Sequence, residues 1–185
     1  GLTKIAYNVS QITDGDFDVN EIVGFSGDKI IVTRTDFNHA SEIYSYDFKK
    51  KSFSQITKVN DAAYSKIALS KFEKRYVTTT DGKKMLVWVV LPPNFDKNKK
   101  YPTLLYCQGG PQSALTQFYS FRWNFQVMAA QGYIIVAPNR RGMQGHGVEW
   151  NEQISKDWGG QVIDDYLSAI DDVSKESYID KARVG

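Results

Sequence analysis

The sequence predicts a mixed fold, in which short antiparallel strands of the propeller type precede a region of alternating strands and helices. Two observations carry this prediction. Residues 21–57 hold four short alternating segments separated by turns, whereas the chain from residue 101 onward alternates apolar runs with helical periodicity. The pattern changes near residue 70, so we expect one part over residues 1–70 and a second over residues 71–185.

Composition and charge limit the classes of protein to which this chain can belong. The chain has 185 residues and is 42% hydrophobic, which suffices for one sizeable core or two partial ones. Its 23 basic and 21 acidic residues leave a net charge of +2, so we expect no nucleic-acid partner. No apolar run reaches the length of a membrane span, so we expect no membrane partner. Cys107 is the single cysteine, which excludes an internal disulfide, and we expect it to be buried as a small hydrophobe.

The first part resembles a propeller blade in its spacing. The four predicted strands cover residues 21–25, 29–34, 42–47 and 53–57. The tripeptide Gln-Ile-Thr starts at residue 11 and again at residue 55, a separation typical of one blade. Because a propeller needs about 4–8 blades, we expect residues 1–70 to be the C-terminal blade or blades of a propeller in a longer protein.

The second part begins with a hairpin and continues as a parallel sheet. The runs 76–80 and 85–91 flank Asp81-Gly82, a strong hairpin signal. Apolar residues predict a helix over 118–131, ended by Gly132, and a strand over 133–137 that is covered on both faces. A further helix is predicted over 161–174, with Val162, Tyr166, Ile170 and Val173 on one face, and residues 182–185 begin another strand.

The apolar run 102–107 stops at Gln108-Gly109-Gly110-Pro111. Glycine reaches positive φ without steric cost, so such a loop can turn its backbone N–H groups toward an anion. In α/β-hydrolases the loop after the third strand donates one N–H to the oxyanion hole. Gln108, Gly109 and Gly110 are therefore the oxyanion-hole candidates, and the alternative is an ordinary Gly-Pro turn after a buried strand.

Other candidate groups do not form a site. Ser26 lies in Gly-Phe-Ser-Gly-Asp, which lacks the second glycine of a nucleophile elbow. His39 lies in a polar blade loop, and His146 lies in a loop spaced G-x-x-G-x-G, which differs from the dinucleotide fingerprint. Neither histidine has acidic or thiol neighbours at ligand spacing, so we predict no metal and no cofactor.

Several motifs in a fixed order then point to a family. They are Tyr101-Pro102-Thr103-Leu104-Leu105 with Gly109-Gly110-Pro111, Ala130-Gln131-Gly132-Tyr133, Asn139-Arg140-Arg141-Gly142 with Gly145 and Gly147, and Asp157-Trp158-Gly159-Gly160. Together they resemble the prolyl oligopeptidase family of serine peptidases, especially its dipeptidyl-peptidase and acylaminoacyl-peptidase branches. The resemblance implies β-propeller blades followed by the N-terminal half of an α/β-hydrolase (peptidase) domain.

The resemblance also implies where the chemistry lies. In the family, Arg183-Val184-Gly185 leads within a few residues to the nucleophile elbow, and the triad runs Ser, Asp, His. We therefore expect the catalytic residues after Gly185 and predict that the 185-residue chain alone is inactive. Many relatives carry His or Tyr where this chain has Gln108. The Gln108 amide either donates to the oxyanion or braces the loop.

Two further expectations concern the surroundings of the site. We expect Arg141 and Asp157 to form an ion pair that holds their loop near the substrate cleft, the alternative being two separate surface charges. The family's sheet order puts the third strand beside the fifth, and without a complete fifth strand the edge from Leu104 to Cys107 should be open and apolar. The remainder of the hydrolase domain, a partner chain or a swapped copy would then cover it.

Three functions stay open at this point. The first is a serine exopeptidase that acts on a peptide substrate and removes short peptides or acylated residues from its N-terminus. The second is an α/β-hydrolase esterase with a propeller, and the third is a non-catalytic interaction module. Bacterial relatives of this kind are often exported, so the resemblance makes the bacterial periplasm the expected compartment.

Overall fold

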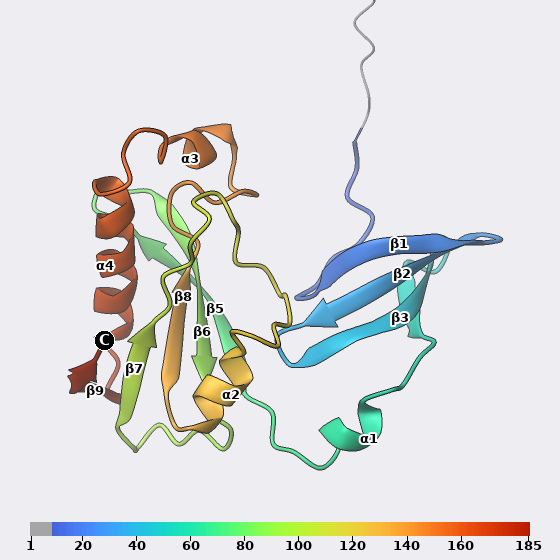
Figure 1. Ribbon diagram of the computed structural model, residues 1–185, viewed down its shortest axis with the longest axis horizontal. Coiled ribbons are helices and arrows are strands. Elements are labelled where there is room, and N and C mark those ends of the chain that lie inside the picture. Colours follow the sequence, from blue (N-terminus) through green and yellow to red (C-terminus); the bar gives the residue numbers. More distant parts are fainter. Residues whose placement is uncertain (1–8) are drawn as a thin grey trace, which may run out of the picture.

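The computed structural model describes residues 9–185 and contains two sheets (Figure 1). The first has the strand order β1-β2-β3-β4, with β1 at Asp18–Ser26, β2 at Lys29–Asp36, β3 at His39–Asp47 and β4 at Ser52–Gln55. The second has the order β5-β6-β8-β7-β9, with β5 at Lys71–Thr78, β6 at Lys84–Leu91, β7 at Tyr101–Leu105, β8 at Ile134–Pro138 and β9 at Ile179–Val184. The predicted fold class is confirmed. The predicted division between residues 70 and 71 falls between the two sheets.

The first sheet is a four-stranded antiparallel meander, as a propeller blade is. Its small core consists of Ile30, Val32 and Tyr46, with Tyr44 and Phe53 packed against it. The repeated tripeptide does not mark equivalent strands, because residues 11–13 lie outside regular structure. The carbonyl of Ile12 instead accepts a hydrogen bond from the Tyr46 hydroxyl.

The second sheet begins as the sequence predicts. Strands β5 and β6 form the hairpin, and β6 runs antiparallel to β8. Strands β7 and β8 are parallel and are joined through α2 (Phe125–Ala130), which is the predicted crossover. All five residues of β8 are buried. Helix α4 (Gln161–Val173) buries the predicted face, and α2 and α4 pack into separate clusters on opposite faces of the sheet (Figure 1).

The first predicted helix is shorter than expected, because it begins only at Phe125. The Ser120 hydroxyl accepts the N–H groups of Arg122 and Trp123 at 3.2 and 2.9 Å, which closes a turn before the helix. Asn124 is the N-cap, and its side chain accepts the N–H of Val127 at 3.1 Å. Gly132 has φ of +89° and ends the helix as predicted.

Two short helices complete the described part, α1 (Asp61–Tyr64) and α3 (Val148–Glu152). Among residues 9–185, no helix is both long enough and apolar enough to cross a membrane.

The expectation of an open edge on β7 is wrong. Strand β9 runs parallel to β7, the Leu105 N–H donates to the Gly185 carbonyl at 2.7 Å, and the Gly185 N–H donates to the Thr103 carbonyl at 3.0 Å. Within residues 9–185, β9 is therefore the outermost strand on this side of the sheet. The expectation of a buried Cys107 is also wrong, because β7 ends at Leu105 and the thiol lies exposed beyond it.

The blade contributes a side chain to the core of the second sheet. Phe37, in the turn between β2 and β3, is 3% exposed and packs within 5.4 to 5.6 Å of the rings of Phe72, Trp88 and Phe125. Its N–H donates to the Gln117 side chain at 3.4 Å. The Asp18 carboxylate also accepts from the Gln117 N–H at 3.0 Å. The two sheets are thus joined by burial as well as by hydrogen bonds.

Candidate functional site

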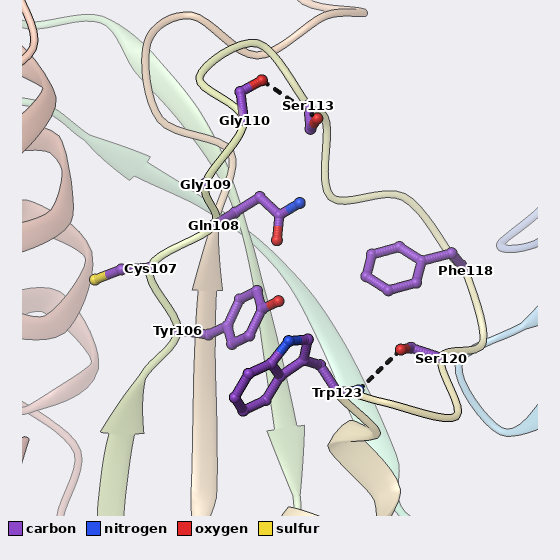
Figure 2. Close-up of a pocket in the computed structure, with 9 residues that line it drawn as sticks. All are labelled: Tyr106, Cys107, Gln108, Gly109, Gly110, Ser113, Phe118, Ser120 and Trp123. Carbon is purple, nitrogen blue, oxygen red and sulfur yellow. Dashed lines mark hydrogen bonds between the residues drawn. The ribbon is translucent and has the colours of Figure 1, made fainter.

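The loop that follows β7 takes the unusual backbone path that its glycines predict (Figure 2). Gly110 has φ of +80°, and its carbonyl accepts the N–H of Gln112 at 2.6 Å. A Cβ on Gly110 would lie 2.9 Å from the Ser113 hydroxyl oxygen, whereas a Cβ on Gly109 would meet nothing within 4 Å. The structure thus requires glycine at position 110 but leaves room for a methyl group at position 109.

A buried arginine fixes this loop from behind. Arg140 is 3% exposed, and its two Nη atoms donate to the Gln108 carbonyl at 2.9 Å and the Pro111 carbonyl at 2.5 Å. Its Nε donates to the Tyr166 hydroxyl at 3.1 Å. That hydroxyl in turn donates to the Gln108 carbonyl at 3.0 Å. The Gln108 carbonyl therefore accepts two hydrogen bonds from the same side.

This anchoring orients the next N–H group. In a trans peptide the C=O and the N–H point in opposite directions, and the described residues contain no cis bond. Because the Gln108 carbonyl faces Arg140 and Tyr166, the Gly109 N–H points away from them. Neither Gly109 nor Gly110 donates its N–H to any acceptor within residues 9–185. Both donors are thus available to an anion.

An open cavity of about 470 Å³ lies beside the loop. Figure 2 shows the nine residues that line it, with the Gln108 amide directed toward Phe118 and the Cys107 thiol directed the opposite way. The thiol lines a second cavity, of about 520 Å³, with Trp158 and Ile163. Cys107 is exposed as a residue, but its thiol is partly shielded from water by its surroundings, and this shielding raises the pKa of the thiol, although Arg140 opposes the shift. The thiol is therefore protonated near neutral pH and is a poor nucleophile.

The predicted ion pair between Arg141 and Asp157 is not formed. The Arg141 guanidinium donates from Nη1 to one carboxylate oxygen of Asp81 at 2.8 Å and from Nη2 to the other at 2.5 Å. Its Nε lies 3.4 Å from the Asp165 carboxylate. The Asp157 carboxylate instead accepts the N–H of Gly160 at 2.8 Å. Two other carboxylates thus pair with Arg141, although its Nε makes no hydrogen bond, and Asp157 closes the turn before α4.

The electrostatics of this cluster follow from burial and charge. Hydrogen bonds from Arg141 and Thr79 hold the pKa of Asp81 well below its usual value. Burial alone would lower the pKa of Arg141, but the Asp81 and Asp165 carboxylates hold it above its usual value. Complete burial raises the pKa of Asp165 despite the hydrogen bond that its carboxylate accepts from the Arg141 N–H. Asp81 is therefore the main counter-charge of Arg141.

Sequence reasoning missed three residues that build the site, Asn139, Arg140 and Tyr166. The Asn139 side chain accepts the Leu115 N–H at 2.9 Å and donates to the Leu115 carbonyl at 3.0 Å, which fixes the chain after the glycine loop. The sequence did contain a signal for Asn139 and Arg140, because both directly follow the buried strand β8. Polar residues in this position lie at the ligand-binding edge of an α/β sheet. Tyr166 was predicted only as part of the apolar face of α4, so the hydrogen bonds of its hydroxyl were not expected.

Neither histidine lies at this site. His39 approaches Asp36 at 2.8 Å on the blade. His146, an exposed residue, lines a cavity between the two sheets, where partial shielding of its ring from water lowers its pKa. Within the part of the chain that the structure describes, no three His, Cys, Asp or Glu side chains are grouped so that they could hold a metal ion.

Residues 119–185 match the sequence profile of the Prolyl oligopeptidase family. The whole chain is 48% identical to Dipeptidyl-peptidase 5 from Porphyromonas gingivalis, of which it spans 27%. The chain thus spans about a quarter of the length of the curated relatives that it matches.

Solved structures agree on the fold. Acylaminoacyl peptidase from Pyrococcus horikoshii superposes with a TM-score of 0.78 at 22% identity, over 93% of this chain and 27% of that protein. Dipeptidyl peptidase 4 from Porphyromonas gingivalis superposes with a TM-score of 0.69 at 24% identity, over 91% of this chain and 24% of that protein. Both likenesses concern the arrangement of the two sheets.

Proposed function

This chain belongs to the prolyl oligopeptidase family, and we propose that it supplies one side of the oxyanion hole of a serine peptidase. The parent enzyme removes short peptides from the N-termini of peptide substrates, in keeping with the name of the relative that is 48% identical over the whole chain. The observation that carries the proposal is the free Gly109 N–H, directed away from the anchored Gln108 carbonyl.

The reaction is an acyl transfer. A serine oxygen bonds to the scissile carbonyl carbon while a histidine takes the hydroxyl proton, and the carbonyl oxygen becomes an oxyanion. Collapse of this intermediate expels the amine, which takes the proton from histidine, and water then hydrolyses the acyl-serine ester. The Gly109 N–H donates to the oxyanion where its charge develops, a contribution of about 10²- to 10³-fold in kcat for one such donor.

The triad is assigned to other residues of the full-length protein. Neither histidine of this chain lines the cavity beside Gly109, and the Cys107 thiol faces the other way (Figure 2). The role of this chain is thus to position hydrogen-bond donors. Arg140 and Tyr166 orient the peptide group whose N–H acts.

Two substitutions in the full-length protein test this role. Gly109→Pro removes the N–H and should lower kcat by about 10²- to 10³-fold. Gly109→Ala keeps the N–H and has room for its methyl group, so kcat should stay within about threefold of the parent value. Thermal unfolding of both variants controls for misfolding. Equal kcat values for folded Pro and Ala variants would remove Gly109 from the oxyanion hole.

The choice of substrate separates the peptidase from the other two functions. The full-length protein should release the chromophore from dipeptidyl anilides with free N-termini faster than from simple acyl esters. Faster turnover of the esters would identify an esterase. Failure of an active-site-directed organophosphonate to label the protein would identify a non-catalytic interaction module.

A further inference from the structure

Buried polar atoms gather at the junction between the blade and the second sheet. Among residues 9–185, six buried side-chain nitrogen or oxygen atoms make no hydrogen bond to another residue. Four of the six lie at this junction, on Asn38, Ser70, Gln117 and Gln126. They come from the β2–β3 turn, the chain that enters β5, the segment before α2 and α2 itself. Unsatisfied polar atoms are uncommon inside proteins, so four in one place indicate that a polar ligand binds there.

Ser70 brings three of these groups together. Its N–H donates to the Gln126 side-chain oxygen at 2.9 Å, and its carbonyl accepts from the Asn38 side-chain nitrogen at 3.2 Å. The residue itself is 3% exposed. Its hydroxyl therefore lies near both carboxamide groups, and each of these groups keeps one free end.

The backbone of Ser70 fixes which end of each carboxamide is free. The Asn38 nitrogen must face the Ser70 carbonyl, because two oxygens would repel each other, so Oδ1 remains as an acceptor. The Gln126 oxygen must face the Ser70 N–H, so Nε2 remains as a donor. The Ser70 hydroxyl can donate or accept. The junction thus offers one acceptor, one donor and one group that can be either.

Water is the ligand that suits this set of groups. A buried water in a protein typically makes about three hydrogen bonds, and it can donate and accept at the same time. It can donate to Asn38 Oδ1, accept from Gln126 Nε2 and bond to Ser70 Oγ in either direction. A metal cation does not suit the site, because the Nε2 hydrogens would point at it. An anion does not suit it either, because Oδ1 would repel it.

We propose that an ordered water molecule binds at this junction and joins the β2–β3 turn, the chain entering β5 and helix α2 through Asn38 Oδ1, Ser70 Oγ and Gln126 Nε2. The Nε2 of Gln117 is a fourth donor there, because the oxygen of the same amide accepts the N–H of Phe37, the neighbour of Asn38. The blade is then held to the second sheet by a hydrated contact next to the dry aromatic contact of Phe37. This inference does not depend on the peptidase function.

A crystal structure of the full-length protein tests the site directly. A single density peak should lie about 2.7–3.2 Å from each of the three named atoms. Direct hydrogen bonds among these atoms, with no peak between them, would overturn the proposal. A peak that refines as a metal ion would also overturn it.

Ser70→Ala in the full-length protein separates a hydrated junction from a dry one by the sign of its effect. If water binds, the substitution removes one of its partners and should lower the thermal unfolding temperature by about 1–3 °C. If the junction is dry, the substitution deletes a buried hydroxyl that bonds to nothing, and the unfolding temperature should stay the same or rise. An unchanged or raised temperature therefore contradicts the water site.

Ser65→Ala is the matched control, because Ser65 is exposed and its hydroxyl donates to the Ala62 carbonyl at 3.1 Å, away from the junction. It should leave the unfolding temperature within about 1 °C of the parent value. An equal decrease in both variants would mean that the loss in Ser70→Ala does not come from a bound water, and the proposal would fall.

Discussion

Arg140 and Arg141 are neighbours in the chain and equally buried, yet they serve different regions of the molecule. Around Arg141 the guanidinium meets the carboxylates of Asp81 and Asp165. Around Arg140 every acceptor is neutral, since it donates to the Gln108, Pro111 and Arg141 carbonyls and to the Tyr166 hydroxyl.

This difference separates a structural charge from one that serves the site. The charge of Arg141 is balanced by carboxylates, and it ties the β5–β6 hairpin turn to α4. The charge of Arg140 is held by dipoles alone, so its positive potential extends to the glycine loop where an oxyanion would form. We expect substitutions around Arg141 to change stability and substitutions around Arg140 to change turnover.

The largest effect is expected on the stability side. Asp165→Ala removes a fully buried carboxylate and leaves the Arg141 guanidinium and N–H with fewer partners. Breaking a buried pair in this way costs about 3–5 kcal/mol of unfolding free energy, which denaturant titration of the full-length protein would measure. The exposed Asp171→Ala on the same helix should change it by less than about 0.5 kcal/mol. Similar losses for the two variants would contradict a structural role for this pair.

The next effect concerns turnover. Arg140→Lys keeps the charge but cannot reach the Gln108 and Pro111 carbonyls with a planar fork, so the Gly109 N–H loses its fixed direction. We expect kcat to fall about 10- to 100-fold with KM nearly unchanged, as steady-state kinetics would show. Arg141→Lys should lower the unfolding temperature while kcat stays within about threefold. If Arg140→Lys changed only stability and Arg141→Lys changed only kcat, the roles assigned to the two arginines would be wrong.

A smaller effect is expected from the second donor to the Gln108 carbonyl. Tyr166→Phe removes one hydrogen bond to that carbonyl and one acceptor for Arg140, a loss of about 1 kcal/mol. We expect kcat to fall a few-fold. Tyr178→Phe is the control, because that hydroxyl accepts from Arg75 at 2.7 Å and lies in the other core cluster. It should leave kcat unchanged.

The smallest effect is a dependence on pH. The pKa of Asp81 is lowered below its unfolded value of 3.8, so its contribution to stability is present above about pH 4 and is lost as the pH falls toward the folded value. Asp81→Asn should therefore differ from the parent most at neutral pH, and the difference should shrink below pH 4. Because the Asp81 side chain is 35% exposed, added salt should reduce it. A difference that is constant from pH 3 to pH 7 would contradict this linkage.

The sequence predicted those features that local pattern controls. The hairpin at Asp81-Gly82, the buried strand β8 and the apolar face of α4 follow from turn chemistry and periodicity, and all three are confirmed. The helix predicted from residue 118 was wrong because Ser120 and Asn124 compete for the backbone N–H groups that a longer helix would use.

The ion-pair partners of charged side chains could not be predicted from the sequence. Asp157 is 16 residues from Arg141 and Asp81 is 60 away, yet the hairpin turn brings Asp81 to the guanidinium. Which carboxylate is nearer depends on how the β5–β6 hairpin lies against β8, and no local pattern reports that. The donors at Gly109 and Gly110 were predicted as candidates, whereas the clamp formed by Arg140 and Tyr166 needed the tertiary fold.

Phe37 restricts which propellers could be joined to the second sheet of this protein. Its ring belongs by sequence to the blade but completes an aromatic cluster with Phe72, Trp88 and Phe125 under the second sheet. A chimaera that joins a foreign propeller to this hydrolase half would leave a hole there unless the incoming turn also carries a large aromatic residue. A large aromatic residue at this turn is therefore a practical rule for choosing compatible propellers.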